Sequence, residues 1–138
     1  MTGLKFDLKS IGQRCRQFGA KFLVDGTQSV GALPLNLQET QIDVLVCASY
    51  KWMLGPYGLG LAYYGDDFDQ GIPLEESWAN RTNAKNFGGL TKYDSNYSGQ
   101  AGRYNVGESA NFISAPVLLA ALEQLNVWTP EGLSLIHI

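Results

Sequence analysis

The sequence predicts an α/β domain with a mostly parallel sheet. Two apolar segments, Phe22–Asp25 and the β-branched-rich Ile42–Ala48, are typical of strands that are buried on both faces. Residues 26–41 between them are long enough for the crossover that parallel strands need. A third apolar segment, Gly60–Tyr64, follows after a glycine-rich turn, so we expect it to run antiparallel on the same sheet.

Two amphipathic helices are expected beside these strands. Residues 7–18 form the first, with Asp7 as its N-cap and Gly19 as its stop. Ser114–Trp128 forms the second, with Ser114 as its cap. The apolar stripes of the two helices comprise Leu8, Ile11, Cys15 and Phe18, and Leu118, Ala121, Leu122 and Leu125.

Residues 65–102 have a different character. They are polar and rich in Asn and Gly, and they carry scattered aromatic side chains. Only Pro73–Glu76 is a candidate for a short helix there. We expect an ordered excursion that packs on a neighbour or covers a site, because aromatic residues argue against disorder. Residues 129–138, which include the single histidine, His137, are an unassigned tail, either read-through or an appended sequence.

Composition excludes several classes of function. A net charge of −3 offers no basic face for nucleic acid or for anionic lipid. No apolar run reaches the roughly 18 residues that a membrane span requires, and the N-terminus lacks the apolar core of a signal peptide. Cys15 and Cys47 are expected to be buried free thiols, and no Cys/His cluster indicates a metal site. We therefore expect a cytoplasmic protein without a metal.

A carboxylate and an amine each follow the end of a predicted strand. Asp25 ends the first strand, and Lys51 comes shortly after the second. In open α/β sheets, ligands bind at the carboxyl ends of the strands. An amine that can form a Schiff base, beside a carboxylate that can face a pyridinium nitrogen, suggests a site for pyridoxal 5'-phosphate (PLP).

Neighbouring residues could complete such a site. The amide of Gln28 can donate a hydrogen bond to the phenolic oxygen of PLP, and the hydroxyls of Ser49 and Tyr50 can reach its phosphate. The glycines of residues 55–60 allow close backbone approach. Each residue alone is ordinary, since a lysine at a strand end is usually a surface residue. The combination indicates PLP, and an unrelated α/β ligand-binding module is the alternative.

Two segments resemble the class V aminotransferase family, whose members have the fold type I architecture. They are Val24–Gly31, with Asp-x-x-Gln, and Ser49–Gly60, with a polar residue, Lys and a Gly-Pro-x-Gly-x-Gly turn. The family includes cysteine desulfurases and isopenicillin N epimerase-like proteins. The resemblance covers about residues 4–128. It implies that residues 1–128 are an internal part of the large PLP-binding domain of an aspartate aminotransferase-like enzyme.

The resemblance also implies roles. Lys51 would be the catalytic, cofactor-bearing lysine, Asp25 would pair with the pyridine nitrogen, and Gln28 would contact the phenolic oxygen. Residues 103–111 look like a family segment in which a hydroxyl, here that of Ser109, reaches the cofactor phosphate of the other subunit, which implies a homodimer. The expected cofactor-binding set is Asp25, Gln28, Ser49, Tyr50, Lys51 and Ser109.

The implied activity is PLP-dependent chemistry on an amino acid, by transamination, epimerisation or elimination. A cysteine desulfurase is disfavoured, because Tyr50 stands where many members have His and neither Cys15 nor Cys47 is placed as a mobile nucleophile. The residues around Lys51 look closer to the epimerase-like branch. A second hypothesis is that the isolated chain is an inactive piece of such an enzyme.

Overall fold

The computed structural model describes residues 3–107 and 111–134. The chain divides into two compact units. The sheet unit comprises residues 1–62 and 112–138, and the loop unit comprises residues 63–111. Each unit has its own internal contacts, so the two are described separately below.

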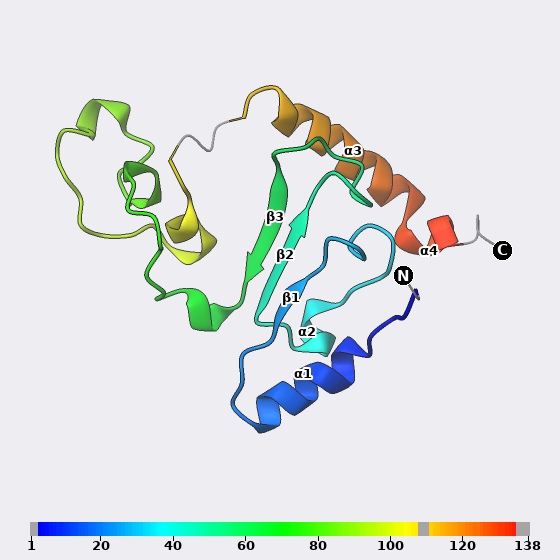
Figure 1. Cartoon of the computed structure of the whole chain (residues 1–138). Coiled ribbons are helices and arrows are strands. Elements are labelled where there is room, and N and C mark those ends of the chain that lie inside the picture. The colour runs from blue at the N-terminus through cyan, green and yellow to red at the C-terminus, as the bar shows by residue number, and fades with distance from the viewer. Residues whose placement is uncertain (1–2, 108–110, 135–138) are drawn as a thin grey trace. The chain divides into compact units, whose positions relative to one another are not determined.

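A small sheet forms the centre of the sheet unit (Figure 1). Its strands are β1 (Leu23–Asp25), β2 (Val44–Ala48) and β3 (Gly60–Tyr64), in the order β1-β2-β3. β1 and β2 are parallel, with Asp25 opposite Val46, whereas β3 runs antiparallel to β2. The predicted fold class and the predicted strand directions are therefore confirmed.

The first predicted helix is present as α1 (Leu8–Gln17). Asp7 caps it, because its carboxylate accepts hydrogen bonds from the Ser10 amide at 3.0 Å and from the Ser10 hydroxyl at 2.6 Å. Gly19 ends it with a φ of 64°, a left-handed conformation that glycine adopts without a steric penalty. Both predicted helix boundaries are confirmed by these contacts.

A short helix that the sequence analysis missed, α2 (Leu37–Thr40), packs against α1. The side-chain oxygen of Asn36 caps it by accepting from the amides of Gln38 at 3.0 Å and Glu39 at 3.2 Å. Asn36 followed by Glu39 is the spacing of a capping signal. The signal was therefore present in the sequence.

Gly12, which is not part of the predicted apolar stripe, lies at the contact between α1 and α2. Gly12 is the buried position of α1, whereas Ile11 and Phe18 are exposed. A Cβ on Gly12 would lie 1.9 Å from the carbonyl oxygen of Thr40. The close approach of the two helices therefore depends on the absence of a side chain.

Replacing Gly12 by alanine should destabilise the sheet unit. Alanine gains about 1 kcal/mol of helix propensity over glycine. Overpacking against a fixed backbone carbonyl costs about 1–3 kcal/mol, and the overlap here is severe, so the loss should exceed the gain. We expect a lower urea midpoint for Gly12→Ala and a small rise for its exposed neighbour variant Gln13→Ala. A midpoint raised by Gly12→Ala would contradict this packing.

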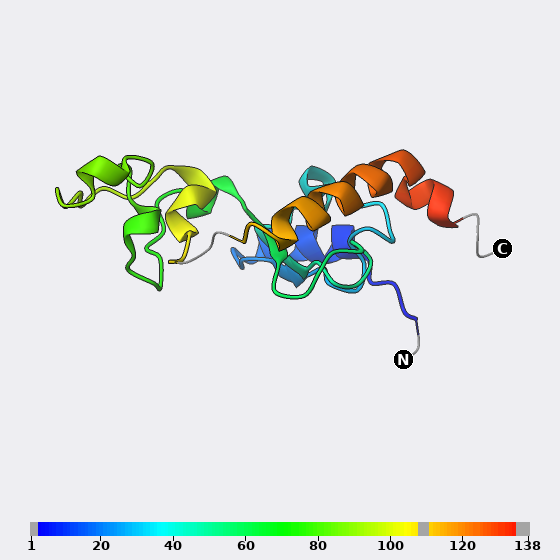
Figure 2. The ribbon, with the colours of Figure 1, turned by 90° about the horizontal axis from the view of Figure 1, so that it is seen from above.

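The second predicted helix has the predicted bounds as α3 (Ser114–Trp128), and it leads directly into α4 (Pro130–Ser134) (Figure 2). Leu118 and Leu125 are buried, as the stripe predicted. The predicted cap is wrong, since the N-cap position is Ile113 and makes no side-chain capping bond. Part of the unassigned tail forms α4, the origin of the tail stays a prediction, and His137 lies outside the described residues.

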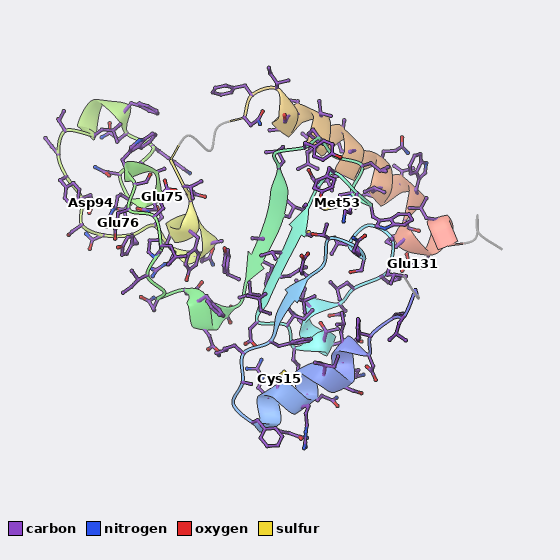
Figure 3. All side chains as sticks on the ribbon, viewed as in Figure 1. Cys15, Met53, Glu75, Glu76, Asp94 and Glu131 are labelled. Carbon is purple, nitrogen blue, oxygen red and sulfur yellow. The ribbon has the colours of Figure 1, made fainter. Side chains whose placement is uncertain are left out.

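The core of the sheet unit joins β2, the following turn and α3. Met53, labelled in Figure 3, is 2% exposed and packs with Cys47 and Leu125. Val30, Leu122 and Leu133 lie against this cluster. Met53 anchors the turn that carries Lys51, so the position of that turn depends on the core.

The loop unit is ordered mainly by polar contacts. Short 3₁₀ helices occur at Asp66–Phe68, Trp78–Asn80, Phe87–Gly89 and Gln100–Tyr104. The predicted helix at Pro73–Glu76 is wrong, because those residues form bends and irregular backbone. The expectation of ordered but irregular structure holds for the described residues. Whether the unit packs on a neighbour or covers a site stays a prediction.

Arg81 is the centre of the loop unit. Its guanidinium donates to the Ser95 carbonyl at 2.8 Å, pairs with Glu76 and lies 4.2 Å from the centre of the Tyr97 ring. The Tyr97 hydroxyl donates to Glu76 in turn. These partners satisfy a charge that is only 7% exposed, as a buried guanidinium requires.

Candidate functional site

Asp25 and Lys51 lie at the same edge of the sheet. Asp25 is the last residue of β1, and Lys51 follows the end of β2 after a short turn. Because β1 and β2 are parallel neighbours, their carboxyl ends meet at this edge (Figure 1). The charges of the two side chains also interact, since Lys51 contributes to lowering the pKa of Asp25.

Hydrogen bonding joins the loop after β1 to the end of β2. The hydroxyl oxygen of Thr27 accepts from the Ala48 amide at 3.0 Å. Further along, Gly31 has a φ of 92°, and a Cβ there would lie 2.5 Å from the Trp52 carbonyl oxygen. The loop that carries Asp25 and the turn that carries Lys51 are therefore in direct backbone proximity.

Asp25 is held as an ionised carboxylate. The Thr27 amide donates a hydrogen bond to Asp25 Oδ1 at 2.9 Å. The side chain and the amide of Thr27 are the main reasons why the pKa of Asp25 lies below its ordinary value, and the Lys51 charge adds a smaller effect. The negative charge of Asp25 at the carboxyl end of β1 can therefore pair with a cationic group of a ligand.

Lys51 is half-buried beside an aromatic pair. Its Nζ lies 5.7 Å from the centre of the Tyr50 ring, and Tyr50 stacks on Tyr57 with ring centres 4.5 Å apart and an interplanar angle of 17°. A ring face at this distance attracts an ammonium group. Tyr50 is 40% exposed, so its ring contacts solvent as well as Lys51 and Tyr57.

Ser49, a predicted phosphate contact, faces into the protein. It is fully buried, and its hydroxyl donates to the Pro56 carbonyl at 2.6 Å with the Leu59 carbonyl at 3.0 Å. Its amide also donates to Leu59, at 3.0 Å. Ser49 therefore holds the glycine-rich turn closed in this structure, and its role at a cofactor stays a prediction.

Two further residues, Gln28 and Ser109, were predicted to contact the cofactor. Gln28 is exposed in the same loop as Asp25. Ser109 lies outside the described residues. Thr27, which the sequence analysis did not select, contacts both Asp25 and the Ala48 amide at the end of β2. A signal for it existed, because an Asp side chain commonly accepts from the amide two residues on.

The cysteines have the burial that was expected for Cys47 and less for Cys15, which is half-buried in α1. Burial raises the pKa of the Cys47 thiol, and the charge of Asp25 raises it further. Its sulfur lies 3.9 Å from the sulfur of Met53 in the core. Cys47 is therefore a protonated core thiol at neutral pH.

A cavity of about 130 Å³ lies in the loop unit, and its lining includes none of Asp25, Gln28, Ser49, Tyr50 and Lys51. Three of its charged side chains already have partners, since Arg81 pairs with Glu76 and Asp94 accepts from Thr82. Its lining comprises Glu76, Ser77, Trp78, Arg81, Asn83, Leu90, Lys92, Tyr93 and Asp94. We place the candidate site at the sheet edge, where the Asp25 carboxylate and the Lys51 amine lie.

Within residues 3–107 and 111–134, no group of His, Cys, Asp and Glu side chains is arranged to hold a metal ion. Among the helices of the same described part, none combines the length and apolar character needed to cross a membrane.

The sheet edge fits PLP by the chemistry of its side chains. The ionised carboxylate of Asp25 suits a protonated pyridine nitrogen, and the primary amine of Lys51 suits an aldehyde. Both groups follow adjacent parallel strands whose loops are tied together. Nothing among these contacts opposes such a ligand.

A family model and individual relatives match this chain. The model of the family described as aminotransferase class V matches residues 1–129. The cysteine desulfurase IscS of Histophilus somni is 44% identical over 61 residues, which are 44% of this chain and 15% of that protein. The uncharacterised aminotransferase YcbU of Bacillus subtilis is 30% identical over 121 residues, which are 87% of this chain and 30% of that protein.

Solved structures agree. The cystine C–S lyase C-DES, in complex with its product cysteine persulfide, matches with a TM-score of 0.81 and 30% identity over 94% of this chain and 34% of that chain. The cysteine desulfurase CsdA of Escherichia coli matches with a TM-score of 0.78 over 96% of this chain and 31% of that chain. Its 20% identity supports the fold alone. The chain thus spans between 15% and 34% of these four proteins.

The fold type I architecture predicted from the sequence is confirmed by these neighbours, and the alternative of an unrelated α/β module is wrong. The match extends over both units and over the two segments that carry Asp25 and Lys51. The chain belongs to the class V aminotransferase family of PLP-dependent enzymes.

Proposed function

We propose that this chain supplies the cofactor-anchoring edge of a PLP-dependent enzyme that acts on an amino acid, with Lys51 as the catalytic lysine and Asp25 as its acidic partner. The observation that carries the proposal is the hydrogen bond from the Ala48 amide to Thr27. It joins the loop of the carboxylate to the strand that leads to the amine. Family membership supports the cofactor.

Each residue has a separate task in this proposal. Lys51 would hold the cofactor aldehyde through Nζ, and the same nitrogen would take and return the α-proton of the substrate as a general base. Asp25 stays ionised and keeps the ring nitrogen protonated. PLP, when bound, supplies an electron sink for the substrate α-carbon. Gln28, Tyr50, Ser49 and Ser109 remain proposed contacts to the phenolic oxygen and phosphate.

The reaction is proposed among transamination, epimerisation and elimination. Elimination at a carbon–sulfur bond has a specific observation in its favour, namely the 30% identity to the cystine C–S lyase over 94% of this chain. A desulfurase mechanism in this chain would need a thiolate nucleophile. Cys47 is a poor candidate, because burial raises its pKa.

The cofactor proposal is tested by titrating the purified chain with PLP. We expect a new near-visible absorbance band and, after borohydride reduction, a pyridoxyl group on the peptide that contains Lys51. A colourless chain whose lysines are labelled evenly would contradict binding, and it would support the second hypothesis, that the isolated chain is an inactive piece.

The reaction is tested next with three assays on the loaded protein. Release of cysteine persulfide, pyruvate and ammonia from cystine indicates elimination. Conversion of an added keto acid to an amino acid indicates transamination, and loss of optical activity indicates epimerisation. A homodimer and a cytoplasmic location also remain proposals; sedimentation analysis addresses the first.

A further inference from the structure

We infer that Tyr57 is a positioning residue, whose ring holds the Tyr50 ring in the place where it faces the ammonium group of Lys51. The inference deepens the proposed function and rests on it for its meaning at the cofactor. The two ring contacts themselves belong to this chain without any ligand.

The Lys51 side chain needs a contact beyond its own backbone to hold its amine in one place. The main chain of its turn is fixed, because the Leu54 amide donates to the Lys51 carbonyl at 3.0 Å and the Gly55 amide donates to the Ser49 carbonyl at 2.8 Å. A flexible hydrocarbon stem separates this main chain from Nζ. A contact at Nζ itself is therefore what can confine the amine.

The Tyr50 ring supplies such a contact. Lys51 Nζ lies 5.7 Å from the centre of this ring, which is within the distance of about 6 Å at which a ring face attracts an ammonium group. Tyr50 is 40% exposed, so the packing of the core does not by itself fix the direction of its ring. The contact with Lys51 then depends on a second group that holds the Tyr50 ring.

Tyr57 is that second group. Its ring stacks on the Tyr50 ring with centres 4.5 Å apart and an interplanar angle of 17°, a favourable arrangement for two aromatic rings. The Ser49 hydroxyl donates to the Pro56 carbonyl at 2.6 Å, so the residue before Tyr50 is tied to the residue before Tyr57. This bond brings the two ends of the turn together and places the rings side by side.

Most of the Tyr57 side chain lies in solvent. It is 79% exposed, whereas the buried cluster that anchors the turn consists of Cys47, Met53 and Leu125. A change at Tyr57 removes little buried surface, and substitutions at such positions usually have small effects on stability. Variants of Tyr57 should therefore fold and report the ring contact.

The first test observes the Lys51 amine in the chain without cofactor. Each lysine is dimethylated with ¹³C-formaldehyde and a borohydride reductant, which leaves its positive charge in place, and the Lys51 signal is identified by its loss in Lys51→Ala. We expect the Tyr50 ring to shift this signal upfield of that of the exposed Lys9 and to show nuclear Overhauser contacts with it. A Lys51 signal that coincides with that of Lys9 and shows no ring contact would overturn the inference.

Three variants then separate the ring of Tyr57 from its other properties. Tyr57→Leu keeps an apolar side chain without the ring, so the Lys51 signal should move toward that of Lys9. Tyr57→Phe keeps the ring without the hydroxyl, so the signal should stay shifted. Leu54→Ala is the matched control, because it removes an apolar side chain of the same turn that is 52% exposed, and it should also leave the signal shifted.

Two results of this comparison would contradict the role of the Tyr57 ring. One is an unchanged Lys51 signal in a folded Tyr57→Leu protein, and the other is an equal loss of the shift in Leu54→Ala. If Tyr57→Leu does not fold, Tyr57→Gln also lacks the ring, suits an exposed position and gives the same comparison.

The second test titrates the same variants, without methylation, with PLP. We expect the apparent affinity at Lys51 to fall roughly two- to tenfold in Tyr57→Leu, the effect of losing one aromatic stack, and to stay unchanged in Tyr57→Phe. An unchanged affinity in Tyr57→Leu would overturn the positioning role. If PLP does not bind the unaltered chain, the proposed function fails, whereas the NMR comparison still decides whether Tyr57 positions the Tyr50 ring.

Discussion

Replacing Lys51 by alanine should abolish the near-visible absorbance that the chain gains with PLP. The expected loss is complete, because the other lysines, Lys5, Lys9, Lys21, Lys85 and Lys92, lie outside the segment that follows β2. Borohydride reduction followed by peptide mapping should find no preferred site of pyridoxyl attachment in Lys51→Ala.

The control for this experiment is Lys9→Ala, which removes an exposed lysine of α1. It should keep the absorbance band and the label on Lys51. A Lys51→Ala protein that still forms a single, saturable lysine adduct would show that another amine holds the cofactor. The assignment of Lys51 would then be wrong.

Replacing Asp25 by asparagine should leave PLP bound through Lys51 but slow exchange of the substrate α-proton on the order of 100-fold. Asparagine keeps the size of the side chain and can still accept from the Thr27 amide, which now donates to Asp25 Oδ1 at 2.9 Å. It carries no charge to keep the ring nitrogen protonated. Exchange into deuterated water measures the rate, and the ¹⁵N shift of labelled PLP reports the ring proton.

Asp66→Asn is the matched control, because Asp66 is an exposed carboxylate of the loop unit. It should change neither the exchange rate nor the ¹⁵N shift. An Asp25→Asn protein with the original rate and a protonated ring nitrogen would remove the acidic role proposed for Asp25.

Strand and helix assignments followed from the sequence where the local pattern was strong. The all-apolar run that became β2 and the capped helix α1 required no knowledge of their neighbours. The buried position of α1 could not be predicted in this way. Gly12 is buried because α2 approaches it, and that contact joins residues distant in the sequence. Two residues of the predicted apolar stripe, Ile11 and Phe18, are exposed.

The candidate site shows the same division. The sequence placed Asp25 and Lys51 at one sheet edge, because strand ends can be read from apolar runs, and the parallel pairing agrees. The sequence could not show in which direction the hydroxyl side chains of Ser49 and Thr27 point. Ser49 turns inward because two carbonyls of its own turn accept from it, and Thr27 turns toward β2. Both depend on turn geometry that forms only in the folded chain.

The inward hydroxyl of Ser49 has a consequence for the thermodynamics of ligand binding. Because Ser49 closes the turn onto Pro56 and Leu59 in the folded chain, the conformational entropy of that segment is lost on folding. A ligand that binds Lys51 then meets a preorganised segment and does not bear that entropic cost itself. Affinity at this edge is thus coupled to the stability of the turn, even through a residue that the ligand need not touch.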